Sequence, residues 1–402
     1  MAAFASREYR ALLSAYTVST AGDQFARVAL SVLIFDRTGS AALTALTYAL
    51  TFLPDLVGGP LLAGIADRRP RRTVMITADV LRAVLVALMT LPGVSFPVIA
   101  ALLVVVQLAG APANAARGAL LPQILGDDDY PAGQAGLSSA GQAAQVAGFA
   151  GGGALIVAIG TNGVLLADAA TFAASAAFVL LGIRPREASA KATVRRGWGS
   201  DLVVGARLVV TTPALRALIA FACISGIYIA GEALAAPYAA ELGGGPMLVG
   251  LLFAGFAAGA VAGMLVLARV PEELRLRLLP ALALCSCLPL VLCVVDPPAA
   301  VVVLLFVVSG FASGYQVTAS TTFMRLVPDD RRGQAFGLAV TALKVSQGVG
   351  VGLAGLAAEW LGPHGTVALA GAIGVGAACG VGLMWRGASA VTSTTRPTPA
   401  PG

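Results

Sequence analysis

The stretch Gly64-Ile65-Ala66-Asp67-Arg68-Arg69-Pro70-Arg71-Arg72 places four arginines and one aspartate in nine residues, between two long apolar runs. Each run can cross a bilayer, whose hydrocarbon core needs about 20 apolar residues of helix. Short arginine-rich loops stay on the cytoplasmic side of a membrane. The stretch therefore predicts a membrane protein and assigns this loop to the cytoplasm.

The composition of the whole chain agrees with this prediction. Mean hydropathy is +0.87, and 11% of the residues are charged, whereas soluble domains carry about 25%. We expect an all-α, polytopic fold in which 402 residues form twelve transmembrane helices joined by short loops. The predicted spans cover residues 11–35, 41–63, 73–92, 97–121, 134–159, 162–183, 214–239, 246–268, 276–295, 299–324, 334–358 and 364–386.

The basic residues orient these spans. With the N-terminus inside, 22 of the 26 lysines and arginines fall in segments assigned to the cytoplasm, as the positive-inside rule requires. Both termini are then cytoplasmic, and the protein is a multi-pass protein of the inner (plasma) membrane of the cell. The pI of 9.3 follows from this bias, so no nucleic-acid partner is expected.

An internal repeat divides the chain into halves. Ala21-Gly22-Asp23 recurs as Ala230-Gly231-Glu232, and Gly133-Gln134-Ala135 recurs as Gly333-Gln334-Ala335. Two parallel six-helix halves with a site between them are typical of secondary transporters. We predict an N-terminal half (1–183), a cytoplasmic linker (184–213), a C-terminal half (214–386) and a disordered tail (387–402).

Glycines at small-xxx-small spacing allow helices to approach closely. Gly148 and Gly152 match Gly348 and Gly352 at an offset of 200 residues. Tight static packing and sliding between moving helices are both compatible with this spacing.

The arginine-rich loop, read as Asp67-Arg68-x-x-Arg71-Arg72, resembles the signature loop of the major facilitator superfamily. Gly22-Asp23-Gln24-Phe25 and Ala78-Asp79-Val80-Leu81-Arg82-Ala83 resemble the bacterial branch of enterobactin and macrolide exporters. The resemblance implies transport by alternating access. It also implies a cytoplasmic gate whose predicted members are Asp67, Arg68, Arg71, Arg72, Arg117 and Arg325. The alternative role for this loop is a topology signal that contacts lipid headgroups.

Charged residues inside the predicted spans are the candidates for proton coupling, because each is costly to insert. Asp23 and Glu232 lie on helices that the resemblance places along the central cavity. Asp23 and Arg27 are four residues apart, so a fixed ion pair on one helix face is the alternative for that acid. Lys344 would neutralise either acid or contact an anionic substrate.

Three further charges, Asp79, Arg82 and Asp168, fall at positions that the resemblance places on the outside of the bundle. We predict that they form scaffold ion pairs, because buried charges are normally paired.

Few polar residues lie on the predicted cavity helices. A mostly apolar chamber with scattered hydrogen-bonding groups suits an amphipathic organic molecule better than a sugar. For any single residue, the alternative is a hydrogen bond between helices. The predicted cavity residues are Tyr16, Thr20, Gln107, Asn114, Tyr228, Tyr315 and Gln316.

The residue inventory excludes several activities. One histidine, His364, and five cysteines within apolar spans give no basis for a metal site or a histidine-dependent triad. Phosphate-loop spacing is also absent from the sequence. We therefore expect no enzymatic activity, no cofactor and no metal, with a proton gradient as the energy source.

The leading prediction is proton-coupled efflux, by antiport, of a small hydrophobic or amphipathic compound such as a drug, siderophore or secondary metabolite. Uptake by proton symport is one alternative. A non-transporting structural or regulatory membrane protein is the other. The expected partners are the small-molecule substrate and the lipid bilayer, and we expect a monomer.

Overall fold

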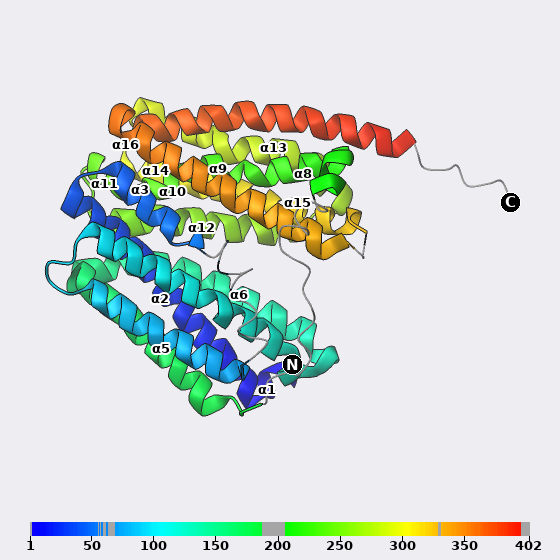
Figure 1. The fold of residues 1–402 in the computed structure, drawn as a ribbon. Coiled ribbons are helices and arrows are strands. Elements are labelled where there is room, and N and C mark those ends of the chain that lie inside the picture. Colours follow the sequence, from blue (N-terminus) through cyan, green and yellow to red (C-terminus); the bar gives the residue numbers. More distant parts are fainter. Residues whose placement is uncertain are drawn as a thin grey trace. The chain divides into compact units, whose positions relative to one another are not determined.

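A computed structural model describes residues 2–54, 56, 58, 62, 69–186, 206–328 and 331–394. Over these ranges the chain forms helices joined by turns, with no strand (Figure 1). The all-α prediction is confirmed. Asp67, Arg68, most of the predicted linker and the end of the predicted tail lie outside the described residues.

The first part of the chain forms α1 (Ala2–Ala5), α2 (Arg7–Thr38), α3 (Ala41–Leu50), α5 (Arg71–Met89) and α6 (Phe96–Gly182). Serines cap two of these helices: Ser6 accepts a hydrogen bond from the Tyr9 N–H, and Ser40 accepts one from the Leu43 N–H. Inside α6, Gly126 and Gly160 have φ of 69° and 73°. Glycine tolerates this left-handed region, so these residues divide α6 into three helical segments.

The rest of the chain forms α8 (Pro213–Cys223), α9 (Ser225–Tyr228), α10 (Ala230–Ala233), α11 (Ala235–Glu241), α12 (Pro246–Ala268), α13 (Glu272–Val291), η1 (Leu292–Val295), α14 (Ala299–Ser313), α15 (Tyr315–Leu326) and α16 (Arg332–Thr394). The span predicted at 214–239 is interrupted, whereas the one at 246–268 is a single helix. Pro237 lacks the N–H that would bind the Ala233 carbonyl, which favours an interruption before α11. Gly362 divides α16 with φ of 71°.

Seven helical stretches among the described residues are long and apolar enough to cross a membrane. Two of them, Asp128–Gly182 and Arg332–Gly387, contain 55 and 56 residues, whereas one crossing needs about 20. Each includes one of the positive-φ glycines, where the helix direction changes. Membrane-spanning helices are therefore present, while the count of twelve and the side of each terminus stay predictions.

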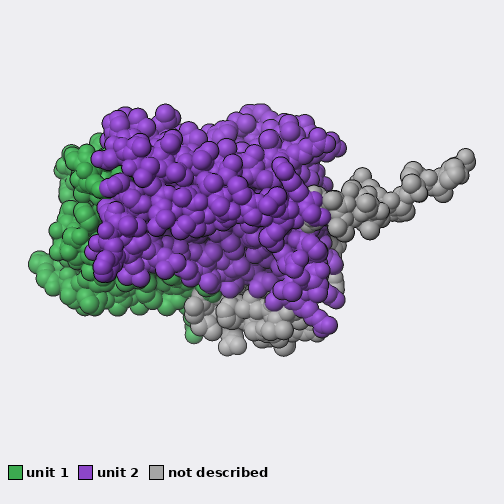
Figure 2. All heavy atoms as spheres, turned by 90° about the horizontal axis from the view of Figure 1, so that it is seen from above, with its two compact units in different colours: residues 1–194, 232–257 green, residues 195–231, 258–402 purple. Residues whose placement is uncertain are grey.

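The chain divides into two compact units (Figure 2). Unit 1 contains residues 1–194 and 232–257, and unit 2 contains residues 195–231 and 258–402. Unit 1 thus combines the first helices with α11, which follows Glu232, and the beginning of α12.

Glycines mark the closest helix contacts inside each unit. In unit 1, a Cβ on Gly148 would lie 2.8 Å from the Ala21 carbonyl oxygen, so α6 packs directly on the α2 backbone. In unit 2, a Cβ on Gly350 would overlap the Gly226 carbonyl, whereas one on Gly352 would meet open space. In unit 2 the close approach of α16 to α9 is therefore at Gly350, two residues before the predicted Gly352.

Candidate functional site

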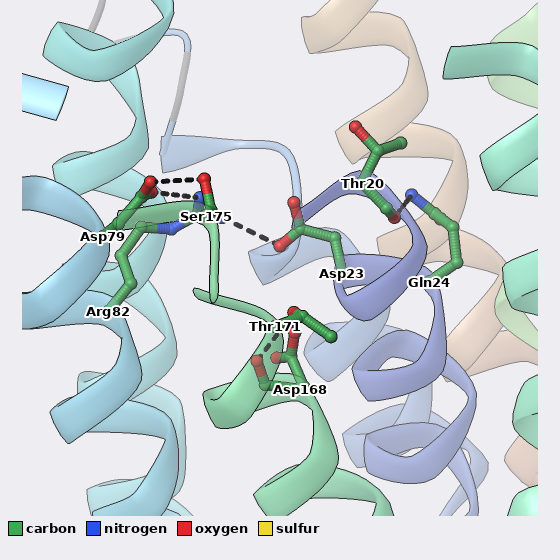
Figure 3. Close-up of polar contacts among 8 residues, drawn as sticks. All are labelled: Thr20, Asp23, Gln24, Asp79, Arg82, Asp168, Thr171 and Ser175. Carbon is green, nitrogen blue, oxygen red and sulfur yellow. Dashed lines mark hydrogen bonds and ion pairs between the residues drawn. The ribbon is translucent and has the colours of Figure 1, made fainter. Parts of the chain in front are cut away.

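Asp23 of α2 forms an ion pair with Arg82 of α5 (Figure 3). Asp23 Oδ1 lies 2.8 Å from Arg82 Nη2, and the side chains are 30% and 9% exposed. The pair joins two helices across 59 residues of sequence. The alternative of a fixed Asp23–Arg27 pair is therefore wrong, because the Arg27 guanidinium lies over the rings of Tyr48 and Phe149.

Arg82 also lies near Asp79, the acid of its own helix. Asp79 Oδ1 lies 4.0 Å from Arg82 Nη1, and Asp79 Oδ2 accepts a 2.7 Å hydrogen bond from Ser175 of α6. The guanidinium carbon is 4.0 Å from the centre of the Phe172 ring. Asp79 and Arg82 are buried, and their contact agrees with the predicted scaffold ion pair.

Asp168 of α6 lies in the same region (Figure 3) and is 1% exposed. Its Oδ1 accepts a 3.3 Å hydrogen bond from the Thr171 hydroxyl. A Cβ on Gly22 would overlap Thr171 Oγ1, so the glycine before Asp23 permits this approach. Asp168 is therefore a buried acid that accepts a hydrogen bond from within its own helix.

A cavity of about 20 Å³ lies between these elements, which is room for one water molecule. Asp23 and Asp168 line it together with Arg27, Thr51 and Gln107. Gln107, a predicted cavity residue, thus lies beside the candidate proton acid. The sequence signal that could have indicated this contact is Gly22 directly before Asp23, because a glycine lets a second helix pack closely beside the acid.

Glu232 of α10 receives a hydrogen bond from Tyr48 of α3, with a distance of 2.5 Å between Tyr48 Oη and Glu232 Oε2. The Arg27 guanidinium is 5.7 Å from the centre of the Tyr48 ring. Phe253 of α12 stacks on Tyr48, at 5.9 Å between ring centres. Both candidate acids, Asp23 and Glu232, therefore lie in unit 1. Helix α2 carries Asp23 itself and also Arg27, which lies beside Tyr48, the hydrogen-bond donor to Glu232.

Three predicted cavity residues meet in unit 2. Gln316 Nε2 lies 3.2 Å from the Ala222 carbonyl oxygen and 3.2 Å from the hydroxyls of both Tyr228 and Tyr315. Tyr315 in turn donates a 2.8 Å hydrogen bond to the Phe221 carbonyl. The nitrogen end of the Gln316 amide is therefore held from three directions.

The other predicted cavity residues are more dispersed. The Arg117 guanidinium lies over the Tyr16 ring at 4.1 Å, and the Thr20 carbonyl accepts a 3.4 Å hydrogen bond from Gln24. Asn114 is exposed, and Lys344, a predicted proton-coupling residue, is half-buried on α16.

The described members of the predicted gate bind within their own units. Arg71 Nη1 donates to the Ala119 carbonyl at 2.8 Å, and Arg72 Nη2 donates to the Leu180 carbonyl at 2.6 Å. Arg325 forms an ion pair with Glu272. Arg71 and Arg72 thus hydrogen-bond α5 to α6.

Sequence reasoning missed a second ionic contact at the start of α2. Glu8 accepts hydrogen bonds from the Arg184 N–H at 2.7 Å and from Arg186 Nη2 at 2.6 Å. Burial raises the pKa of Glu8, but these hydrogen bonds and the positive charges of the two arginines outweigh it, so the pKa is lowered. The contact joins the ends of the first and sixth predicted spans.

Comparison with known proteins identifies the family. The sequence matches the Major Facilitator Superfamily over residues 12–235 and 217–401. It is 32% identical over 277 residues to the "Uncharacterized MFS-type transporter YvqJ" of Bacillus subtilis (strain 168), in a match that spans 66% of this chain and 65% of that relative.

Solved structures share the fold at low sequence identity. A POT family transporter in complex with 5-aminolevulinic acid has a TM-score of 0.73 and 12% identity, over 96% of this chain and 97% of that one. The nucleoside transporter NupG has a TM-score of 0.69 and 15% identity, over 94% and 99%. Matches along nearly the whole sequence and a shared fold lead to one conclusion: the chain belongs to the major facilitator superfamily of membrane transporters.

Proposed function

We propose that this transporter exports a small hydrophobic or amphipathic compound in exchange for protons, by alternating access between the two sides of the inner membrane. The observation that carries the proposal is the ion pair between Asp23 and Arg82, at 2.8 Å between two helices. No cofactor is needed, since the proton gradient supplies the energy.

The pair has the chemistry of a proton exchanger. While Arg82 neutralises Asp23, the carboxylate is stable in the membrane without a proton. When movement of α2 against α5 separates the two side chains, the carboxylate loses its counter-charge, and binding a proton removes the cost of an unpaired buried charge. Return of Arg82 then expels the proton.

The neighbouring charges strengthen this exchange. Asp79 lies 4.0 Å from Arg82, and Asp168 lines the same cavity as Asp23. Asp23 and Asp79 thus share one guanidinium, and Arg27 lines the cavity together with Asp23 and Asp168. A carboxylate in a poorly solvated place favours the uptake of a proton once its counter-charge is withdrawn.

The proposed direction of transport and the proposed substrate class rest on different observations. Export is proposed from the resemblance of the segments around Asp23 and Asp79 to enterobactin and macrolide exporters. An amphipathic cargo is proposed because the candidate cavity residues are few, neutral and scattered among apolar side chains. A chain that keeps the costly Asp23 and Glu232 is better explained by transport than by a structural role.

We further propose that Asp67, Arg68, Arg71 and Arg72, with Arg117 and Arg325, hold the cytoplasmic side closed in one state. Asp67→Asn tests this, because it removes the acidic member without changing the arginines that orient the loop. Full transport by an Asp67→Asn protein that inserts normally would refute the gate.

Transport in inverted membrane vesicles tests the main proposal. A compound panel is offered with and without a proton gradient, using the wild type, Asp23→Asn, and Asp36→Asn as a control on the exposed end of the same helix. We expect gradient-dependent accumulation that Asp23→Asn abolishes and Asp36→Asn retains. Accumulation that survives collapse of the gradient would refute proton coupling, and gradient-driven movement in the opposite direction would establish symport instead.

A further inference from the structure

Unit 2 contains a pocket of about 170 Å³ between α8, α15 and α16. The residues that line it recur on each helix at helical spacing, so one face of each helix is turned towards the pocket. From α15 and α16 the positions are i, i+3, i+4 and i+7. The lining residues on which the argument depends are Gln316, Ala319, Ser320 and Phe323 of α15 and Phe336 and Ala339 of α16.

Among the described residues, the lining is apolar and carries no charged side chain. Its polar side chains are Gln316 and Ser320, which are one helical turn apart on α15. Aromatic rings contribute from two helices, through Phe323 of α15 and Phe336 of α16. Such a pocket favours a neutral, largely apolar group and penalises a charged one.

The orientation of the Gln316 amide adds a specific requirement. Its nitrogen is held by the Ala222 carbonyl and by the hydroxyls of Tyr228 and Tyr315, each at 3.2 Å. An amide nitrogen only donates hydrogen bonds, whereas the amide oxygen only accepts them. With the two N–H groups shared among these three oxygens, the amide oxygen is the end of the side chain that can accept a hydrogen bond from a ligand.

We infer that this pocket binds an uncharged aromatic group that carries a hydrogen-bond donor, as a phenol does, and that Gln316 accepts that hydrogen bond. The volume fits, because an apolar cavity of about 150 Å³ holds benzene. The inference rests on the proposed function in one respect: the group is taken to be part of the transported compound. It names a chemical class within the broader set of amphipathic cargoes.

Photolabelling of the full-length protein in lipid nanodiscs tests the inference without requiring transport. The probe is 4-azidophenol, and 4-azidoanisole is the matched probe in which a methyl ether replaces the hydroxyl donor. Labelled peptides are identified by mass spectrometry. We expect 4-azidophenol to label residues 316–323 or 336–343, with excess phenol competing, and 4-azidoanisole to label them about 3- to 10-fold less, as loss of one hydrogen bond predicts.

Three variants and one control locate the signal. Ala319→Phe and Ala339→Leu fill the pocket from different helices, so each should abolish labelling even if the other fails to fold. Gln316→Met should reduce labelling by 4-azidophenol to the level of the ether. Leu304→Phe adds similar bulk on an exposed part of α14 and should leave labelling unchanged.

The outcomes separate the inference from the function on which it rests. Equal labelling by phenol and ether, as expected for a site filled by lipid chains, overturns the inference. Labelling that survives both filling variants, in protein that remains folded by size-exclusion chromatography, does so too. Proton-driven transport with no labelling would overturn the inference and leave the proposed function intact. Specific labelling in a protein without proton-driven transport would support the pocket and refute the coupling.

Discussion

Tyr48 donates a hydrogen bond to Glu232 across 184 residues of sequence, with 2.5 Å between the two oxygen atoms. The contact attaches a residue from the predicted seventh span to α3. Around it, Phe253 stacks on both Tyr48 and Phe149. Glu232 is thereby held in an aromatic environment in which a negative charge has the Arg27 guanidinium nearby.

Tyr48→Phe should destabilise the protein by about 1–3 kcal/mol, because the Glu232 carboxylate loses its donor and stays buried. Glu232→Gln should cost less, since the Gln amide oxygen can still accept from Tyr48. Thermal unfolding in detergent measures both, with Tyr130→Phe on an exposed ring as the control. If Tyr48→Phe unfolds at the wild-type temperature, the hydrogen bond does not stabilise this state.

Arg82→Met should cost about 3–5 kcal/mol, because it leaves Asp23 and Asp79 without their guanidinium. Adding Asp23→Asn should restore part of that loss, since one unpaired charge is removed. The coupling energy from this double-mutant cycle, measured by unfolding, reports the pair itself. Arg37→Met, at an exposed arginine that donates to the Val94 carbonyl, is the control. Additive effects of the two substitutions would contradict a direct ion pair.

Gly22→Ala should be strongly destabilising, because the added Cβ would overlap Thr171 Oγ1 and lie 2.5 Å from Asp168 Oδ1. Gly118→Ala is the matched control within α6, where a Cβ meets nothing within 4 Å. The control should be neutral or stabilising by up to about 1 kcal/mol, as alanine is the better helix former. Similar melting temperatures for the two variants would mean that α2 and α6 are not closely packed at Gly22.

Glu8 should make stability depend on pH. Its pKa is lowered in the folded state from an ordinary value of 4.5. Its contribution is therefore present above that value and is lost as pH falls through the folded-state pKa. The difference in melting temperature between wild type and Glu8→Gln should be largest at neutral pH and should disappear in acid. A difference that grows in acid would contradict this sign.

The sequence predicted the elements of this fold better than their contacts. Hydrophobic runs locate helices because burial in lipid requires them, and α12 has the bounds predicted for its span. The interruptions of the seventh span were not predicted, since composition remains apolar through Ile224, Ile229 and Leu234. There the helical hydrogen-bonding pattern changes without a change in residue type.

The candidate site was predicted in part. Asp23 and Glu232 were identified by their insertion cost, by their matching places in the repeat and by the family resemblance, and none of these arguments needs contacts. Their partners Arg82 and Tyr48 were missed because each comes from another helix, and periodicity within one helix does not indicate which neighbour it meets. The roles of all these residues in transport stay predictions.

The positions of Asp23 and Arg27 on α2 affect how tightly proton movement would be coupled to transport. The two residues are one turn apart, or about 6 Å along the axis. A helix moves as a rigid element over such a distance, so a movement of α2 that separates Asp23 from Arg82 also displaces Arg27 from beside Tyr48 and Glu232. A proton could then not be exchanged at Asp23 without a change in the surroundings of Glu232. Proton leak through a transporter that carries no substrate would therefore be suppressed.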